Sequence, residues 1–236
     1  MRRRARLAAL FFGALSLVPS PGFGQGRAVP IDRAVARFYS PETGGVESAH
    51  FVYARVLAFE ARLEALSDPD RDAEGLAYRE RHVNAALERH VAETLLAGLH
   101  IDPEPTAAEL ERQMQSARAR LVERIGGEAA LADAVRAERL GQRDVLEILR
   151  RQARASLYLD RMVAPMLDPS DAELQALHRA RRTPFGDLPF DRVRPGLRRW
   201  YIAERLGAAL QSFYQNARGR LTLTWLGDPA PARAPR

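Results

Sequence analysis

Residues 106–127 have the sequence TAAELERQMQSARARLVERIGG, which holds the start, the body and the end of one helix. Thr106 and Glu109 have the spacing of a capping box, in which each side chain accepts a hydrogen bond from the other residue's backbone N–H. Apolar residues then recur at intervals of three and four: Leu110, Met114, Ala117, Leu121 and Ile125. This is the spacing of one helix face, and Gly126-Gly127 ends it. The stretch predicts an amphipathic helix.

The same spacing extends outward from this helix in both directions. It predicts further helices over approximately 46–66, 76–98, 128–139, 141–165, 170–182 and 191–217. Leu221–Trp225 alternates like a short strand, and Ala34–Phe38 has the composition of a partner from the other end of the chain. The predicted fold is therefore mainly α, an irregular multi-helix module whose N-terminal and C-terminal segments form a short two-stranded pair. The Pro/Ala/Arg-rich residues 228–236 are predicted to be a disordered tail.

Residues 1–24 have the features of a cleaved signal peptide. Four arginines within the first six residues precede an apolar run over 7–18, which is short for a membrane span. Gly22-Phe23-Gly24 supplies small residues for a signal peptidase, so cleavage is expected after Gly24 and the mature chain begins at Gln25. An uncleaved membrane anchor is the alternative, and the short apolar run disfavours it. We expect an exported protein of the periplasm.

The composition excludes several kinds of chemistry. The chain has no Cys, and all 36 basic residues are Arg. Thiolate metal sites, Cys nucleophiles, Walker-type phosphate loops and Schiff-base lysines are therefore excluded. The formal net charge of +6 includes the four signal-peptide arginines, so the mature chain retains only +2. Nucleic acid is consequently not predicted as a partner.

Positive charge gathers in the last part of the chain. Residues 142–236 contain 17 Arg against 10 acidic residues. Seven of these arginines surround one loop: Arg179, Arg181, Arg182, Arg192, Arg194, Arg198 and Arg199. A solvated face is the favoured interpretation, and contact with an anionic membrane surface or an acidic polypeptide is the alternative.

No complete catalytic or metal-binding motif is found. Three pairs have spacings that chemistry can use: Glu47 and His50, His82 and His90, Glu60 and Glu64. The first is half of a di-iron motif that needs a second copy, and the second pair is separated by about 12 Å along a helix. The third pair is interpreted as part of an ordinary amphipathic exterior. We therefore predict no catalytic residues, no metal ligands and no cofactor.

Aromatic residues are the remaining candidates for binding. The candidates for lining a peptide groove are Phe51, Tyr53, Phe59, Trp200, Tyr201, Phe213 and Tyr214. Most are expected to belong to the core, because aromatic side chains at helical spacing usually do. Sequence alone does not assign the peptide-binding residues.

The order of these elements resembles the SurA-type periplasmic chaperones, whose N-terminal module is similar to the peptide-binding part of trigger factor. The resemblance rests on short motifs in the same order: LLAGLHI at 95–101, the capping box at 106–109, GGE at 126–128, DPSDAEL at 168–174 and PFDRVRP at 189–195. It covers most of residues 31–226. It implies one chaperone domain over 25–227, built from helices over 46–182 and a C-terminal helix and strand over 190–226. It further implies ATP-independent binding of unfolded envelope and outer-membrane proteins.

One departure from that family concerns enzymatic activity. Its members commonly carry parvulin-type prolyl isomerase domains before the last helix, where this chain has only Thr183–Pro189. Seven residues cannot form a domain with its own core, so we expect no isomerase activity and no enzyme. Two alternatives stay open, a helical scaffold or accessory subunit with one dedicated partner and an enzyme with an unrecognised site. Oligomeric state is not predicted.

Overall fold

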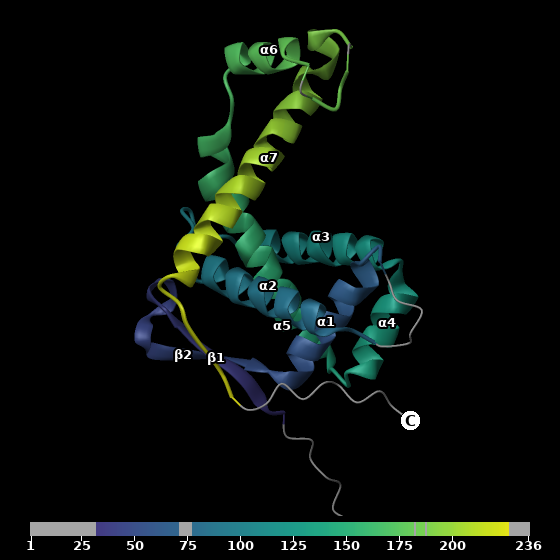
Figure 1. The fold of residues 1–236 in the computed structure, drawn as a ribbon, viewed down its shortest axis with the longest axis vertical. Coiled ribbons are helices and arrows are strands. Elements are labelled where there is room, and N and C mark those ends of the chain that lie inside the picture. The colour runs from purple at the N-terminus through teal and green to yellow at the C-terminus, as the bar shows by residue number, and fades with distance from the viewer. Residues whose placement is uncertain (1–31, 71–76, 182, 187, 227–236) are drawn as a thin grey trace, which may run out of the picture. The chain divides into compact units, whose positions relative to one another are not determined.

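The computed structural model describes residues 32–70, 77–181, 183–186 and 188–226. The expected signal peptide at 1–24 and the expected tail at 228–236 lie outside these residues. The described chain is mainly α-helical, with a small antiparallel sheet (Figure 1). This confirms the predicted fold class. Among the described residues, no helix combines the length and apolar character needed to cross a bilayer.

The described elements follow one another in a simple order. They are β1 (Ala34–Ser40), the short turn η1 (Pro41–Thr43), β2 (Gly45–Tyr53), α1 (Ala54–Ser67), α2 (Glu80–Gly98), α3 (Ala107–Ile125), α4 (Glu128–Ala137), α5 (Gln142–Tyr158), the π-helical turn η2 (Leu159–Val163), the 3-10 turn η3 (Ala164–Leu167), α6 (Asp171–Arg179), α7 (Phe190–Arg218) and β3 (Thr222–Trp225).

The predicted helix over 46–66 is wrong in its first half. Residues Gly45–Tyr53 form β2, and α1 begins only at Ala54. Gly44 and Gly45 have φ values of 101° and 67°, which glycine adopts readily and which turn the chain back onto β1. Val52 then pairs with Ala36 and faces the core, while its neighbours in β2 point the other way. His50 and Val52, two positions apart, are the less exposed residues at this end of β2, which is the spacing of a strand and which the helical assignment overlooked.

The pairing of the two ends of the domain is confirmed. β1 lies antiparallel to β3, with Ala36 opposite Trp225 and Tyr39 opposite Thr222. The backbone N–H of Leu226 donates to the carbonyl of Val35 at 2.8 Å. Because β2 occupies the other side of β1, the sheet has three strands in the order β2-β1-β3 instead of the expected two.

The remaining helices agree with the sequence predictions apart from a few boundaries. Both capping boxes form, with the Glu109 carboxylate accepting from the backbone N–H of Thr106 at 2.9 Å and Glu173 accepting from Ser170 at 2.8 Å. α6 ends at Arg179, slightly before the expected end near 182. α5 continues beyond Tyr158 through the two short turns η2 and η3.

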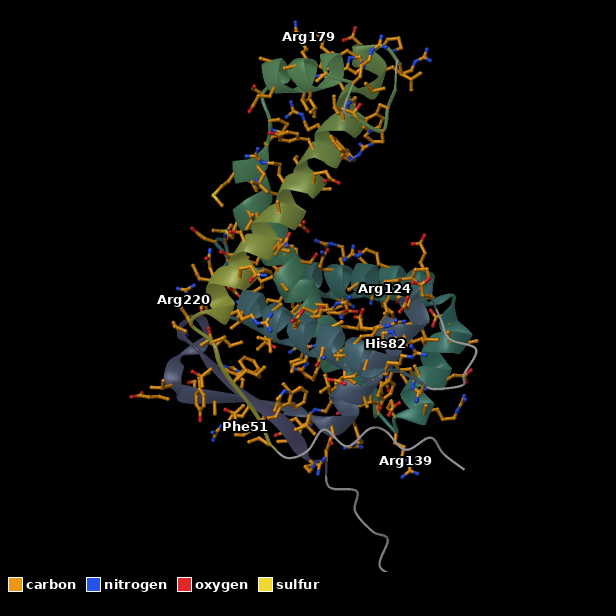
Figure 2. All side chains as sticks on the ribbon, viewed as in Figure 1. Phe51, His82, Arg124, Arg139, Arg179 and Arg220 are labelled. Atoms are coloured by element: carbon orange, nitrogen blue, oxygen red, sulfur yellow. The ribbon has the colours of Figure 1, made fainter. Side chains whose placement is uncertain are left out.

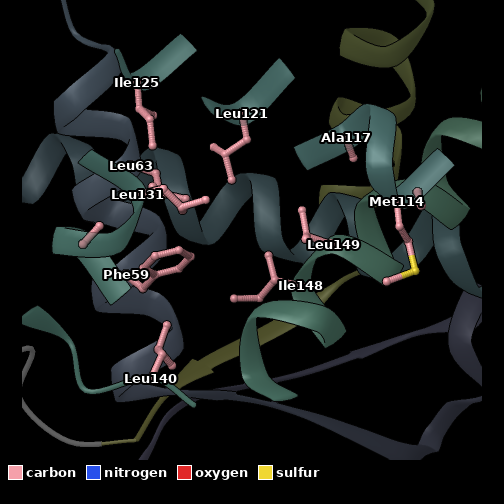
Figure 3. Packing of buried hydrophobic residues seen from close by; sticks show 12 residues of the cluster. Phe59, Leu63, Met114, Ala117, Leu121, Ile125, Leu131, Leu140, Ile148 and Leu149 are labelled. Atoms are coloured by element: carbon pink, nitrogen blue, oxygen red, sulfur yellow. The ribbon is translucent and has the colours of Figure 1, made fainter. Parts of the chain in front are cut away.

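Two clusters of buried apolar side chains make up the core. The first joins α1, α3, α4 and α5 and is drawn in Figure 3: Phe59, Leu63, Met114, Ala117, Leu121, Ile125, Leu131, Ala134, Leu140, Ile148, Leu149 and Ala153. The second packs the inner face of the sheet against α1, α2 and the end of α7: Ala36, Phe38, Val52, Leu57, Ala61, Ala86, Leu87, Val91, Leu95 and Ala217. α1 contributes to both clusters and therefore holds them together.

α6 and the first turns of α7 bury a smaller set of side chains between them. Leu174, Val193 and Leu197 are almost completely inaccessible and belong to neither large cluster. In the short connection before α7, the Phe185 ring lies so near Gly196 that an added Cβ there would be 3.1 Å from it. The His178 ring donates to the carbonyl of Leu188 at 2.8 Å. The described part of the connection is thus packed against the helices it joins.

Gly126 provides a test of how α3 ends. Its φ of 92° lies in the left-handed region, where a Cβ is strained. We expect Gly126→Ala to lower the free energy of unfolding by about 1–2 kcal/mol. Gly207→Ala is the matched control, because Gly207 lies inside α7 and an added Cβ there would have nothing within 4 Å. That control should be neutral or stabilising by up to about 1 kcal/mol in urea denaturation. Equal effects at both positions would contradict the assigned cap.

Candidate functional site

Exposed apolar side chains are concentrated on the two outer strands of the sheet. Among the described residues, eight large apolar side chains are exposed, and five of them lie on β2 or β3. These five are Val46, Phe51, Tyr53, Leu223 and Trp225. We call this set the outer-strand patch. A cluster of this kind on one small sheet is more informative than single exposed apolar residues, which are common.

The patch has two parts, distinguished by the face of the sheet. Phe51 lies opposite Arg37, so these side chains and Tyr53 share the outer face. Figure 2 labels Phe51 at the sheet. On the same face, the Arg37 guanidinium lies 5.3 Å from the centroid of the Tyr39 ring, a cation–π contact. The outer face therefore combines aromatic rings with one positive charge.

Leu223 and Trp225 belong to the opposite face of the sheet. They lie opposite Phe38 and Ala36, whose side chains are fully buried. Leu223 and Trp225 nevertheless keep 39% and 36% of their surface exposed. Both β2 and β3 are edge strands, so each also presents backbone N–H and C=O groups that are not paired within the sheet.

The aromatic residues predicted from the sequence to be candidates for peptide binding differ in their exposure. Phe51 and Tyr53 are exposed on β2, whereas Phe59 is completely buried in the first core cluster. Trp200, Tyr201 and Phe213 are half-buried on α7. The side chain of Tyr214 lies outside the described part of the protein. Sequence reasoning missed Val46, Leu223 and Trp225 as candidates, although the alternation at 221–225 already indicated a strand.

A second candidate feature is a buried ionic network among α1, α2 and α5. The Glu60 carboxylate binds the guanidinium of Arg151 and lies 2.9 Å from Nδ1 of His90. Arg151 also donates through Nε to Glu93 at 3.2 Å. One arginine of α5 therefore connects carboxylates on two other helices. We call Glu60, His90, Glu93 and Arg151 the buried network.

The two carboxyl groups of the network respond differently to burial. Burial opposes ionisation of Glu60, but the charge of Arg151 and the hydrogen bond with His90 outweigh it and hold the pKa below its usual value. For Glu93, burial raises the pKa to about 7; the charge of Glu60 adds to this rise, while Arg151 and Arg89 oppose it. The network therefore contains one firmly ionised glutamate and one that changes protonation near neutral pH.

The three spaced pairs identified in the sequence do not form joint sites. His50 lies on β2 and stacks on Phe38 with ring centroids 5.2 Å apart. The helical motif Glu47-x-x-His50 therefore does not exist. His82 lies 2.9 Å from Asp68 and is separate from His90 in the buried network.

The burial of Glu60 and Glu64 contradicts the prediction that they belong to the exposed face of an amphipathic helix. Their side chains are only 9% and 14% exposed. Glu64 pairs with Arg89 of α2, so the two glutamates bind different partners instead of each other. The sequence did not show this because the arginines that neutralise them lie on other helices.

The arginine cluster near α6 and α7 is partly neutralised. Arg194 and Arg198 both pair with Asp171, and Arg198 also donates to Asp168 at 2.8 Å. Figure 2 labels Arg179 at the end of α6. These pairs are solvent-exposed, which agrees with the favoured interpretation of a solvated face.

No metal site is evident in the part of the chain that the structure describes, where no three His, Asp or Glu side chains are grouped to hold an ion. No family model, curated protein or solved structure matches the chain. The resemblance to SurA-type chaperones therefore stays a prediction from the sequence.

Glu93 gives a prediction about stability and pH. The unfolded chain releases the Glu93 proton near pH 4.5, whereas the folded protein keeps it to about pH 7. Its contribution to stability is therefore fully present below about pH 4.5 and is lost as the pH rises through about 7. Glu93→Gln imitates the protonated group at every pH. We expect the variant to exceed the wild type by up to about 3 kcal/mol at pH 8 and by much less at pH 5.

Urea denaturation of both proteins at pH 5, 6, 7 and 8 measures this difference. Glu104→Gln is a suitable control, because Glu104 is exposed and its pKa is lowered by a hydrogen bond from Arg154. It should leave the pH dependence between 5 and 8 unchanged. A constant difference between Glu93→Gln and wild type across this range would show that Glu93 does not titrate there.

Proposed function

We propose that this protein is an ATP-independent holding chaperone of the bacterial cell envelope that binds extended apolar segments of unfolded exported proteins. Precursors of outer-membrane proteins are the clients implied by the family resemblance. The observation that carries the proposal is the outer-strand patch, where five exposed apolar side chains lie on the two edges of one sheet. Export to the periplasm is supported by the signal-peptide features of residues 1–24.

The chemistry of the patch suits an unfolded polypeptide. An extended segment can pair its backbone with the open edge of β2 or β3 while its apolar side chains contact Phe51, Tyr53 or Trp225. The backbone bonds do not depend on sequence, so many clients can bind. Binding of this kind is weak and reversible, and it competes with aggregation of the client without nucleotide hydrolysis.

No isomerase activity is part of the proposal. The parvulin domain that many members of the resembled family carry would have to lie between α6 and α7, which are joined here by ten residues, 180–189. A connection of that length cannot hold a domain with its own core. The proposed activity is thus holding alone.

The test is suppression of aggregation. We expect the purified mature protein, in several-fold molar excess and without ATP, to slow the light scattering of a urea-diluted outer-membrane protein. Replacing the exposed β2 side chains in the variant Val46→Ser, Phe51→Ser, Tyr53→Ser should reduce this suppression several-fold. The matched control is Leu146→Ser, Met166→Ser, Leu188→Ser, which removes three apolar side chains of similar exposure outside the sheet. The control should retain its activity.

Two outcomes would contradict the proposal. If several unrelated clients aggregate at an unchanged rate, the protein is not a general holdase. If it protects or captures a single envelope protein with fixed stoichiometry, the scaffold alternative replaces the chaperone. If both triple variants lose suppression of aggregation equally, the binding surface does not depend on the sheet in particular. The activity of the wild type would still identify a holding chaperone.

A further inference from the structure

A cavity of about 340 Å³ lies among α2, α3 and α5. It is separate from the outer-strand patch and adjoins the buried network through Glu93. Its volume is at the lower end of the range of roughly 300–1,000 Å³ that is typical of small-molecule sites. The cavity therefore has room for a small organic ligand.

The charges around the cavity are unbalanced. Its lining includes three arginines, Arg89, Arg120 and Arg124, but only one carboxyl group, that of Glu93. Arg89 is neutralised by Glu64, and Glu93 is bound to Arg151. Within the described residues, Arg120 and Arg124 take part in neither a hydrogen bond nor an ion pair. Two guanidinium groups thus line one cavity with no carboxylate of the described chain bound to them.

The position of the two unpaired arginines is fixed by α3. Residues four apart on a helix lie about 5–6 Å from each other on the same face, so Arg120 and Arg124 are neighbours. Figure 2 labels Arg124 on α3. Both residues are reached by solvent, so the cavity is open to an entering ligand. Desolvation of part of the Arg124 guanidinium and the nearby charge of Arg89 lower the pKa of Arg124, and the charges of Glu64 and Glu93 oppose this shift without cancelling it. A bound anion would relieve this repulsion.

The remaining lining residues indicate which other chemical groups a ligand in this cavity could have. Ala117 and Leu121 also belong to the first core cluster (Figure 3). They give the cavity an apolar wall. Gln152 and Ser156 of α5 add neutral groups that can donate or accept hydrogen bonds. The cavity therefore combines a cationic side with apolar and polar neutral surface.

We infer that this cavity binds a small organic phosphate, with Arg120 and Arg124 holding the phosphate group and Ala117 and Leu121 contacting the organic part. A phosphate monoester carries a charge of about −1.5 to −2 at pH 7, which matches two unpaired guanidinium groups better than a single carboxylate does. Its several acceptor oxygens can bind both forks at once. The site is independent of the proposed chaperone activity.

The test uses isothermal titration calorimetry with phenyl phosphate, inorganic phosphate and succinate at low salt. We expect saturable binding of phenyl phosphate, tighter than that of inorganic phosphate because only the former can contact the apolar wall. The variant Arg120→Gln, Arg124→Gln should weaken binding of phenyl phosphate at least about tenfold, since each lost charged hydrogen bond costs about that factor. Arg112→Gln on α3 removes an exposed arginine outside the cavity and should change the affinity less than about twofold.

A second arm distinguishes a soluble phosphate from a lipid headgroup. Vesicles of phosphatidylcholine with and without phosphatidic acid are sedimented with the wild type and with both variants. Sedimentation that requires phosphatidic acid and is lost only in the cavity variant assigns the phosphate to a lipid; binding of phenyl phosphate without sedimentation assigns it to a soluble molecule.

Several outcomes overturn the inference. They are no binding of phenyl phosphate at about 10 mM together with no cavity-dependent sedimentation, equal weakening by Arg112→Gln, and tighter binding of succinate than of phenyl phosphate. Thermal melts of the three proteins show whether the variants are folded, and loss of two unpaired arginines should leave the melting temperature unchanged or raise it.

Discussion

Arg151→Ala is expected to lower the free energy of unfolding by about 3–5 kcal/mol, because it leaves two buried glutamates without their shared cation. Arg151 binds Glu60 and Glu93 at once, and its own side chain is only 16% exposed. The side chains of Glu60 and Glu93 are themselves only 9% and 16% exposed, so little water contacts them in the folded protein. Without Arg151, Glu93 loses its ion pair and Glu60 keeps only its contact with His90. Each carboxyl group must then be protonated or remain charged with less compensation, and either state costs free energy relative to the unfolded chain.

Urea denaturation at pH 7 measures this loss, and Arg136→Ala is the matched control. Arg136 pairs with Asp133 on the surface, where both side chains are more than 70% exposed. Such pairs contribute about 0–1 kcal/mol, so the control should change little. Because protonation relieves the stranded carboxyl groups, the deficit of Arg151→Ala should shrink as the pH falls to 5. A loss below about 1 kcal/mol at pH 7 would mean that the buried network does not stabilise the junction of α1, α2 and α5.

Phe38→Ala is expected to have a comparable effect, about 3–5 kcal/mol, for an apolar reason. Phe38 is fully buried on the middle strand, stacks on His50 of β2 and lies opposite Leu223 of β3. Its removal leaves a cavity in the second core cluster at the point where both outer strands meet β1. The melting temperature should fall by roughly 10 °C for a chain of this size.

Phe51→Ala supplies the comparison for Phe38→Ala. Phe51 has the same side chain on the same sheet, but 45% of its surface is exposed on the outer face. Its substitution should cost less than about 1 kcal/mol. Circular dichroism melts of the two variants give the difference directly. Similar losses would show that the two faces of the sheet are not distinguished by burial.

Helices were predictable where their signals are local. The residues of 106–127 contain the cap, the apolar stripe and the glycine stop of α3 within one segment, and the structure contains each of them. β2 was not predictable by the same reasoning. Val52 fits both a helical stripe with Val56 and Phe59 and a strand period, and only pairing with Ala36, sixteen residues earlier in the chain, decides between them. That information is not contained in the local spacing.

The candidate sites were less predictable than the fold, because each depends on side chains from distant segments. The apolar character of Phe51 and Tyr53 was visible in the sequence, but their exposure follows from the face of β2 on which they lie. The spacing of Glu60 fits a surface residue, and only its contact with Arg151, ninety-one positions later, explains its burial. The cavity arginines Arg120 and Arg124 fit an ordinary charged helix face, since the sequence does not show which arginines lack an acidic neighbour.

The pairing of Ala36 with Trp225 has a consequence for how the chain acquires its structure. The helices α1 to α5 contact one another within residues 54–158, so their packing can form while synthesis of the rest of the chain is still under way. The sheet is different, because its middle strand β1 precedes all the described helices and its neighbour β3 follows them. Because contacts between residues far apart in sequence form slowly, we expect the pairing of β1 with β3 to be a late step in folding. Until residue 225 emerges, β1 has one open edge, and the growing chain is itself a candidate for the kind of association that edge strands promote.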